Sequence, residues 1–109
     1  MNFTEYQKLA RETAVYPDLG DNYTYPTLGL CGESGEVAEK VKKLIRDDSG
    51  AVSYDKRLEI KKELGDVLWY LSNVCSEFGL SLEEVAELNV QKLHDRQARG
   101  KLHGSGDNR

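Results

Sequence analysis

Apolar residues recur at three- and four-residue steps through most of the 109-residue chain, and alternation with a period of two is almost absent. This pattern predicts four amphipathic helices, over about residues 4–16, 26–46, 55–78 and 82–98. Pro17 and the Asp18–Asn22 stretch break the first helix, and a loop over residues 47–53 separates the second from the third. Because the connections are short, we expect the helices to pack as an all-α bundle.

Residues at the ends of the third and fourth segments support these boundaries. Gly79 follows the third segment, in the position where helices often end on glycine. Ser81 and Glu84 have the three-residue spacing of a capping box at the start of the fourth segment. The glycine-rich, polar residues 100–109 are expected to form a flexible end. The chain is therefore interpreted as one domain over residues 1–99, followed by a C-terminal tail.

Composition narrows the class of protein. The formal net charge is −4, with 31% charged and 39% hydrophobic residues, which is typical of a globular domain. No basic patch dominates, so a duplex nucleic-acid partner is not expected, and no apolar run is long enough to span a membrane. Cys31 and Cys75 both lie in apolar helical patterns, so we interpret them as buried free thiols in a reducing cytoplasm.

Two pairs of acids with the same spacing are the most informative feature. Glu33 and Glu36 are three residues apart, and so are Glu63 and Asp66. On a helical wheel each pair lies at the same edge of its own apolar stripe, so packing of the two helices would gather the four carboxylates at one rim. Clustered carboxylates repel each other and are costly to desolvate without a cation. Hard oxygen ligands of this kind suit Mg²⁺, with Mn²⁺ as a possible substitute.

Acids at this spacing also occur on ordinary solvated helix faces, and Lys40 could simply form ion pairs with Glu33 and Glu36. Three helix-interior glycines beside the acids weigh against that interpretation: Gly32, Gly35 and Gly65. Each costs about 1 kcal/mol relative to alanine in a helix. Close approach of a neighbouring helix or a ligand would account for them, and so would tight helix packing without function.

The fourth segment carries a second candidate set. Asn89 lies on its inward stripe, which also includes Val85 and Leu93, and an amide there needs hydrogen-bond partners. Lys92 and Arg96 follow on roughly the same side. Cations beside a carboxylate–metal site would bind phosphate oxygens. Taken alone, ordinary salt bridges near a helix C-terminus are the simpler explanation of these two cations.

Two sequence stretches, GLCGESGEVAEKVKK and KELGDVLWYL, together resemble the MazG-like all-α nucleotide pyrophosphohydrolases, whose motif is E-x-x-E, a variable spacer, then E-x-x-D. The opening FTEYQKLA, the stretch ELNVQKLHDRQ and the closing GSGDNR are similar to the family as well, so the resemblance to a short single-domain member covers nearly the whole chain. It implies a four-helix MazG-type bundle completed by homo-oligomerisation, as a dimer or a dimer of dimers (a homotetramer). Sites in such assemblies can draw residues from two chains.

The resemblance also implies an activity: Mg²⁺-dependent hydrolysis of nucleoside or deoxynucleoside triphosphates at the α–β phosphate junction, to monophosphate and pyrophosphate. The catalytic and metal-binding residues would be Glu33, Glu36, Glu63 and Asp66. One of the glutamates, or the metal, would activate the attacking water. The substrate phosphates would be bound by Asn89, Lys92 and Arg96.

The identity of the base stays open. Four aromatic residues could stack on it, although each suits helix packing or a subunit contact better: Tyr23, Tyr25, Trp69 and Tyr70. Two alternative functions remain. One is an all-α pyrophosphohydrolase with a narrow substrate, such as a dUTPase, which a substrate panel would separate. The other is a non-catalytic helical oligomerisation or binding module, against which the intact acid pairs argue.

Overall fold

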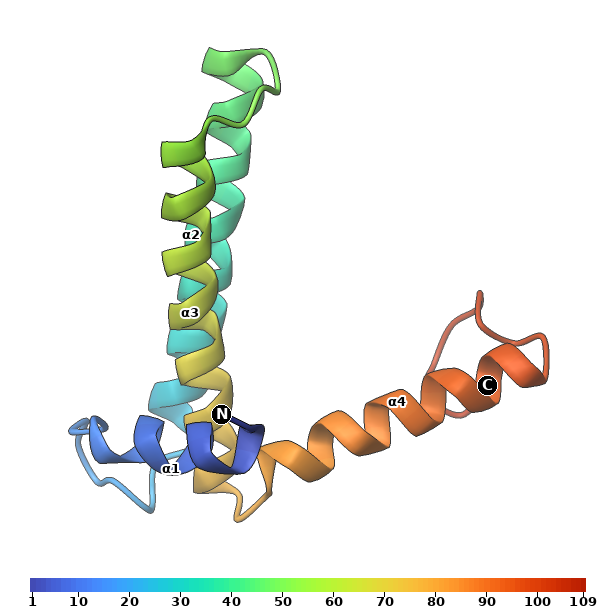
Figure 1. Cartoon of the computed structure of the whole chain (residues 1–109). Coiled ribbons are helices and arrows are strands. Elements are labelled where there is room, and N and C mark those ends of the chain that lie inside the picture. The colour runs from blue at the N-terminus through green and yellow to red at the C-terminus, as the bar shows by residue number, and fades with distance from the viewer.

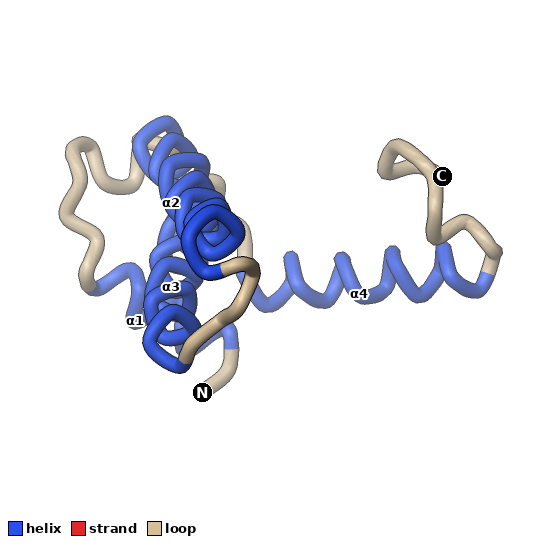
Figure 2. Tube along the Cα trace, turned by 90° about the horizontal axis from the view of Figure 1, so that it is seen from above, coloured by secondary structure: helices blue, strands red, loops and turns tan.

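The computed structural model describes residues 1–109 and contains four α-helices and no strand, so the all-α prediction is confirmed. The helices are α1 (Phe3–Glu12), α2 (Thr24–Asp48), α3 (Tyr54–Glu77) and α4 (Leu82–Ala98). α2 and α3 pack against each other as a long antiparallel hairpin, and α1 crosses the open end of this hairpin (Figure 1). α4 packs against α1 and then projects away from the hairpin, as Figure 2 shows from above.

The first helix is shorter than its pattern predicts. The sequence places its end near Tyr16, but α1 ends at Glu12, and Tyr16 is buried in the segment that follows. The Tyr16 ring stacks on Tyr25 with centroids 5.0 Å apart, and its hydroxyl donates to Glu77 of α3 at 2.6 Å. These long-range contacts keep the residues after Glu12 from continuing the helix, because local helix propensity is a weak preference that tertiary packing overrides.

Side-chain caps fix the starts of α1 and α4. The Asn2 side chain accepts from the amide of Glu5 at 2.8 Å, and Ser81 accepts from the amide of Glu84 at 3.2 Å, as its spacing predicts. Gly79, after α3, has a φ of +66°, in the left-handed region that glycine adopts without a Cβ clash. The chain therefore turns tightly between α3 and α4.

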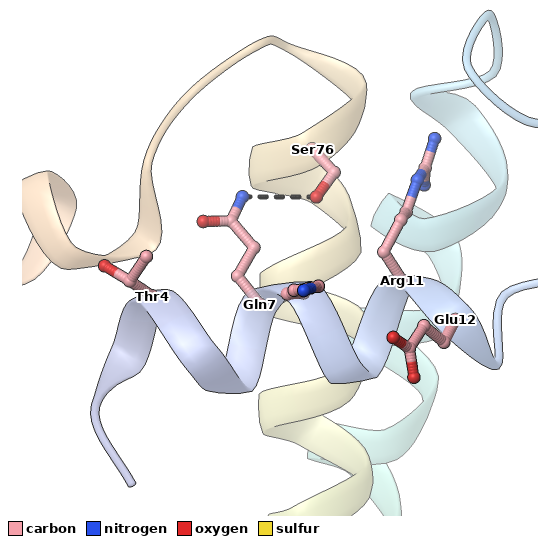
Figure 3. A pocket seen from close by; sticks show the side chains of 6 residues that line it. Thr4, Gln7, Arg11, Glu12 and Ser76 are labelled. Carbon is pink, nitrogen blue, oxygen red and sulfur yellow. Dashed lines mark hydrogen bonds between the residues drawn. The ribbon is translucent and has the colours of Figure 1, made fainter.

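One side chain of α1 holds this turn. Gln7 donates through Nε2 to Ser76 Oγ at 3.1 Å (Figure 3) and to the Leu80 carbonyl at 2.9 Å. Its Oε1 accepts from the amide of Leu82 at 2.9 Å, so one side-chain amide connects α1, α3 and the start of α4. A polar hollow of about 590 Å³ opens beside Gln7, but none of the predicted site residues lines it.

The core of a single chain is small, because only 10 of the 109 residues are buried. Of the apolar residues on α4, Leu82 is buried, but Val85 and Leu93 are each 37% exposed and Leu88 is 66% exposed. The expectation that this helix turns its apolar stripe toward the core of its own chain therefore holds for Leu82 at its start but is wrong for Val85 and Leu93. α4 leaves the hairpin instead, and completion of the bundle by a second copy stays a prediction.

The two cysteines differ in burial. Cys75 of α3 is buried, as predicted, whereas Cys31 of α2 is exposed, so its predicted burial is wrong for the single chain. Both are free thiols. None of the helices combines the length and the apolar character that crossing a membrane requires.

Candidate functional site

The hairpin brings three of the four predicted acids together. Glu33 comes from α2, and Glu63 and Asp66 come from successive turns of α3. One carboxylate oxygen of each residue lies within 4.8 Å of the others. Glu36 lies one turn further along α2, outside this group and exposed to solvent, although its charge still acts on Glu33. The matched offsets on the two helices therefore produce a shared cluster, with one acid at its margin.

No ion pair in the structure involves any of these acids. Lys40, the cation that could have neutralised them, lies 3.8 Å from Glu59 instead. Burial raises the pKa of Glu33, and the negative charges of Asp66 and Glu63 raise it further. Three carboxylates that converge without a cation from the protein fit a divalent metal, because their oxygens are the ligands that hard cations prefer. The ordinary salt-bridge explanation does not hold for this cluster.

The glycines near the acids do not mark helix contacts within the chain. A Cβ added at Gly32, Gly35 or Gly65 would meet no atom within 4 Å, so close approach of a neighbouring helix in the same chain does not explain them. Gly29 is the glycine that makes such a contact, because a Cβ there would overlap the ring of Tyr70. The open space at the other three positions leaves room beside the acids for a ligand or a second chain.

An aromatic hollow of about 370 Å³ opens next to the cluster, lined by Thr13, Glu33, Asp66, Trp69 and Tyr70. Trp69 donates from Nε1 to Thr13 Oγ1 at 2.8 Å. The rings of Trp69 and Tyr70 meet edge to face, with centroids 5.0 Å apart. The structure therefore places fixed aromatic surfaces beside the acids, whereas the sequence favoured packing or interface roles for these two residues.

The predicted phosphate-binding residues all lie on α4, which leads away from the hairpin (Figures 1 and 2). Asn89 is exposed and its side chain makes no hydrogen bond, so its predicted inward orientation is wrong for the single chain. Lys92 pairs with Asp107 of the tail at 2.9 Å, and the same tail buries Arg96. The structure does not bring these three residues to the acids of their own chain.

A buried carboxylate on α3 was not found from the sequence. The Glu77 side chain is completely buried and accepts from Arg11 Nη2 at 2.6 Å and from the Tyr16 hydroxyl at 2.6 Å. The backbone amides of Gly20 and Asn22 donate to it at 3.0 and 2.7 Å. Burial alone would raise the pKa of Glu77, but these four hydrogen bonds outweigh burial and lower it to about 2.

Glu77 belongs to a network that connects the loop before α2 to α3. Asn73, also buried, accepts from Arg11 Nη1 at 3.0 Å and donates to the Trp69 carbonyl at 3.1 Å. The network therefore supports the backbone next to the aromatic hollow. Its one sequence signal is the four-residue spacing of Asn73 and Glu77, beside the apolar stripe of α3.

Comparison with known proteins agrees with this geometry. The protein-family model of the MazG nucleotide pyrophosphohydrolase domain matches the sequence over residues 23–100, which include all of α2, α3 and α4. The chain is 42% identical over 114 residues to the Gene 37 protein of Mycobacterium phage L5, and the match covers 100% of both chains. No solved structure gives a significant match. The chain therefore belongs to the MazG nucleotide pyrophosphohydrolase family, hydrolases that act on the phosphoric anhydride bonds of nucleoside triphosphates.

Proposed function

We propose that the chain is a Mg²⁺-dependent enzyme that hydrolyses nucleoside or deoxynucleoside triphosphates to monophosphate and pyrophosphate. One observation carries the proposal: oxygens of Glu33, Glu63 and Asp66 lie within 4.8 Å of one another, with no cation from the protein beside them. Because the donor set is carboxylate only, without histidine or cysteine, it favours Mg²⁺ over zinc. Membership of the family supports the reaction class.

In this proposal the acids divide two tasks. The residues that hold the metal are Glu33, Glu36, Glu63 and Asp66, and one of the glutamates accepts a proton from the attacking water. The metal, when bound, supplies charge neutralisation on the phosphate oxygens and lowers the pKa of water. Water attacks the α-phosphorus, the bond from that phosphorus to the bridging oxygen breaks, and pyrophosphate leaves with the bridging oxygen.

A second copy would complete the site. Within one chain α4 leads away from the hairpin, so Asn89, Lys92 and Arg96 reach the acids only if α4 of one subunit packs against the hairpin of another. The small core of the single chain supports this arrangement, as do the exposed apolar residues Leu88 and Ile45, which are 66% and 69% exposed. A dimer, or a dimer of dimers, would bury these surfaces.

Mixing two inactive variants tests the shared site. Glu63→Gln removes an acid and Lys92→Gln removes a cation, and each variant alone is expected to be nearly inactive. In a mixed dimer one site would carry both changes and the other neither, so random pairing should restore about a quarter of wild-type pyrophosphate release. If the co-expressed mixture stays inactive although mixed dimers form, acids and cations belong to the same chain.

The aromatic hollow would take the base. Trp69 Nε1 is engaged with Thr13, whose hydroxyl donates to the Ala10 carbonyl at 3.0 Å, so neither side chain has a free hydrogen atom to read base edges, and the Tyr70 hydroxyl is the remaining neutral donor in the lining. Base stacking on aromatic rings is tolerant of sequence. We therefore expect broad specificity, with kcat/KM values across the bases within roughly tenfold, because hydrogen-bonded readout is what gives larger discrimination.

Pyrophosphate release from a panel of nucleoside and deoxynucleoside triphosphates with Mg²⁺ checks both the reaction and its breadth. A strong preference for one nucleotide, such as dUTP, would contradict the broad specificity and favour the narrow-substrate alternative. Absence of release from every nucleotide, with Mg²⁺ or Mn²⁺, would overturn the enzyme assignment for this chain and leave a helical binding module.

A further inference from the structure

The C-terminal tail folds back along the end of α4 (Figure 1), whereas its composition predicts a flexible end. Its backbone carbonyls accept hydrogen bonds from arginine side chains. Arg96 Nη2 donates to the Asp107 carbonyl at 2.7 Å, and Arg99 Nη2 donates to the Arg109 carbonyl at 2.7 Å. Arg109 itself donates to the carbonyl of Gly106 at 2.6 Å. The tail is therefore attached to α4 by specific contacts.

The carboxylate of Asp107 sits between two cations. Its Oδ1 accepts from Lys92 Nζ at 2.9 Å and lies 3.3 Å from Arg96 Nη2. Lys92 has no other ion-pair partner in the structure. The side chain of Arg96 is 4% exposed, whereas that of Asp107 is 81% exposed. The guanidinium is thus fixed by the tail, while the carboxylate faces solvent and can be exchanged.

We infer that Lys92 and Arg96 form an oxyanion site that the chain's own Asp107 fills, and that a phosphate group takes the place of the Asp107 carboxylate. Phosphate and carboxylate oxygens accept the same charge-assisted hydrogen bonds from ammonium and guanidinium groups. Since one oxygen of Asp107 occupies the space between both cations, a phosphate oxygen cannot use that space until the carboxylate leaves.

The tail is then an internal competitor of the substrate. The apparent affinity for the phosphate is the intrinsic affinity multiplied by the fraction of molecules in which the carboxylate has moved away. The inference rests on the proposed function for the identity of the anion, a triphosphate or its pyrophosphate product. The occupation of the two cations by Asp107 is independent of that function.

The variant Asp107→Asn tests the competition. It is expected to lower the KM for nucleoside triphosphate by about three- to tenfold without changing kcat, since a single solvent-exposed ion pair opposes binding in the wild type. It should raise the affinity for inorganic pyrophosphate, measured by calorimetry in EDTA, by a similar factor. Adding Lys92→Gln to Asp107→Asn should abolish this gain.

A matched control is Asp95→Asn, which also removes one carboxylate charge; Asp95 lies on α4 and pairs with Arg99 at 2.7 Å, not with Lys92. This control measures how much the loss of one negative charge near the end of α4 changes pyrophosphate affinity by itself. That affinity should stay close to the wild-type value. Equal affinities in the two variants, or weaker binding in Asp107→Asn, would overturn the competition. Because calorimetry in EDTA requires no hydrolysis, it decides this point even if the wild type releases no pyrophosphate.

Discussion

Replacing Glu63 with glutamine is expected to reduce pyrophosphate release at least about a hundredfold, because it removes a charged oxygen from the three that converge on the proposed metal. Glutamine has nearly the same shape, so the hairpin should persist. Since the three acids repel one another without a cation, the metal-free variant should melt at the same temperature as the wild type or higher. Steady-state pyrophosphate release and thermal melting with and without Mg²⁺ measure both effects.

The matched control for this variant is Glu39→Gln. Glu39 lies on α2 but pairs only with Lys42 and Lys43 of its own helix, at 2.9 and 3.9 Å. Its neutralisation should leave activity almost unchanged. If Glu63→Gln retains full activity, the metal assignment is wrong. If both variants lose activity equally, the overall charge of the hairpin matters and the cluster has no special role.

The second large effect is on stability. Glu77→Gln is expected to lower the free energy of unfolding by about 3 kcal/mol, because breaking a buried charge pair leaves groups without partners. Glu77 accepts from four donors, and the variant leaves Arg11 without its anionic partner. That loss is large beside the roughly 5–15 kcal/mol that stabilises a typical domain. Urea unfolding measures it, with Glu12→Gln, on the exposed face of α1, as the control.

The same carboxylate predicts a dependence on pH. The pKa of Glu77 falls from 4.5 to about 2 on folding, so its contribution is fully present above about pH 4.5 and is lost as the pH falls toward 2. The difference in unfolding free energy between wild type and Glu77→Gln should therefore shrink over this interval. Urea unfolding at several pH values, followed by circular dichroism, checks it. A constant difference down to pH 2 would show that shape and hydrogen bonds, not charge, carry the stabilisation.

The acid cluster could be predicted from the sequence because it depends on local periodicity. The positions of Glu33 on its helix and of Glu63 and Asp66 on theirs follow from 3.6 residues per turn, and the apolar stripes set how the two helices face each other. The four helices follow from the same pattern, and the start of α4 follows from Ser81. These features need no knowledge of distant contacts.

The features that the sequence did not predict depend on distant partners. The four donors to Glu77 come from residues 11–22, more than fifty residues away along the chain. The helical periodicity of the sequence around Glu77 gives no indication of them. The direction of α4 depends on the side-chain amide of Gln7, so Asn89 could not be placed from its position on a helical wheel. The fold of the tail comes from arginines that bind backbone carbonyls, whereas its composition indicates only a lack of apolar residues.

The attachment of α4 at one end makes it a lever arm. A helix of 17 residues is about 25 Å long, so a rotation of about 10° at the joint around Gln7 would displace the far end by roughly 4 Å. Phosphate-binding side chains tolerate much smaller errors, since a misplacement of about 1 Å can cost a hundredfold in rate. In the proposed assembly, the partner subunit therefore does more than supply a surface. By holding the C-terminal end of α4 in place, it determines how accurately Lys92 and Arg96 are positioned relative to the substrate phosphates.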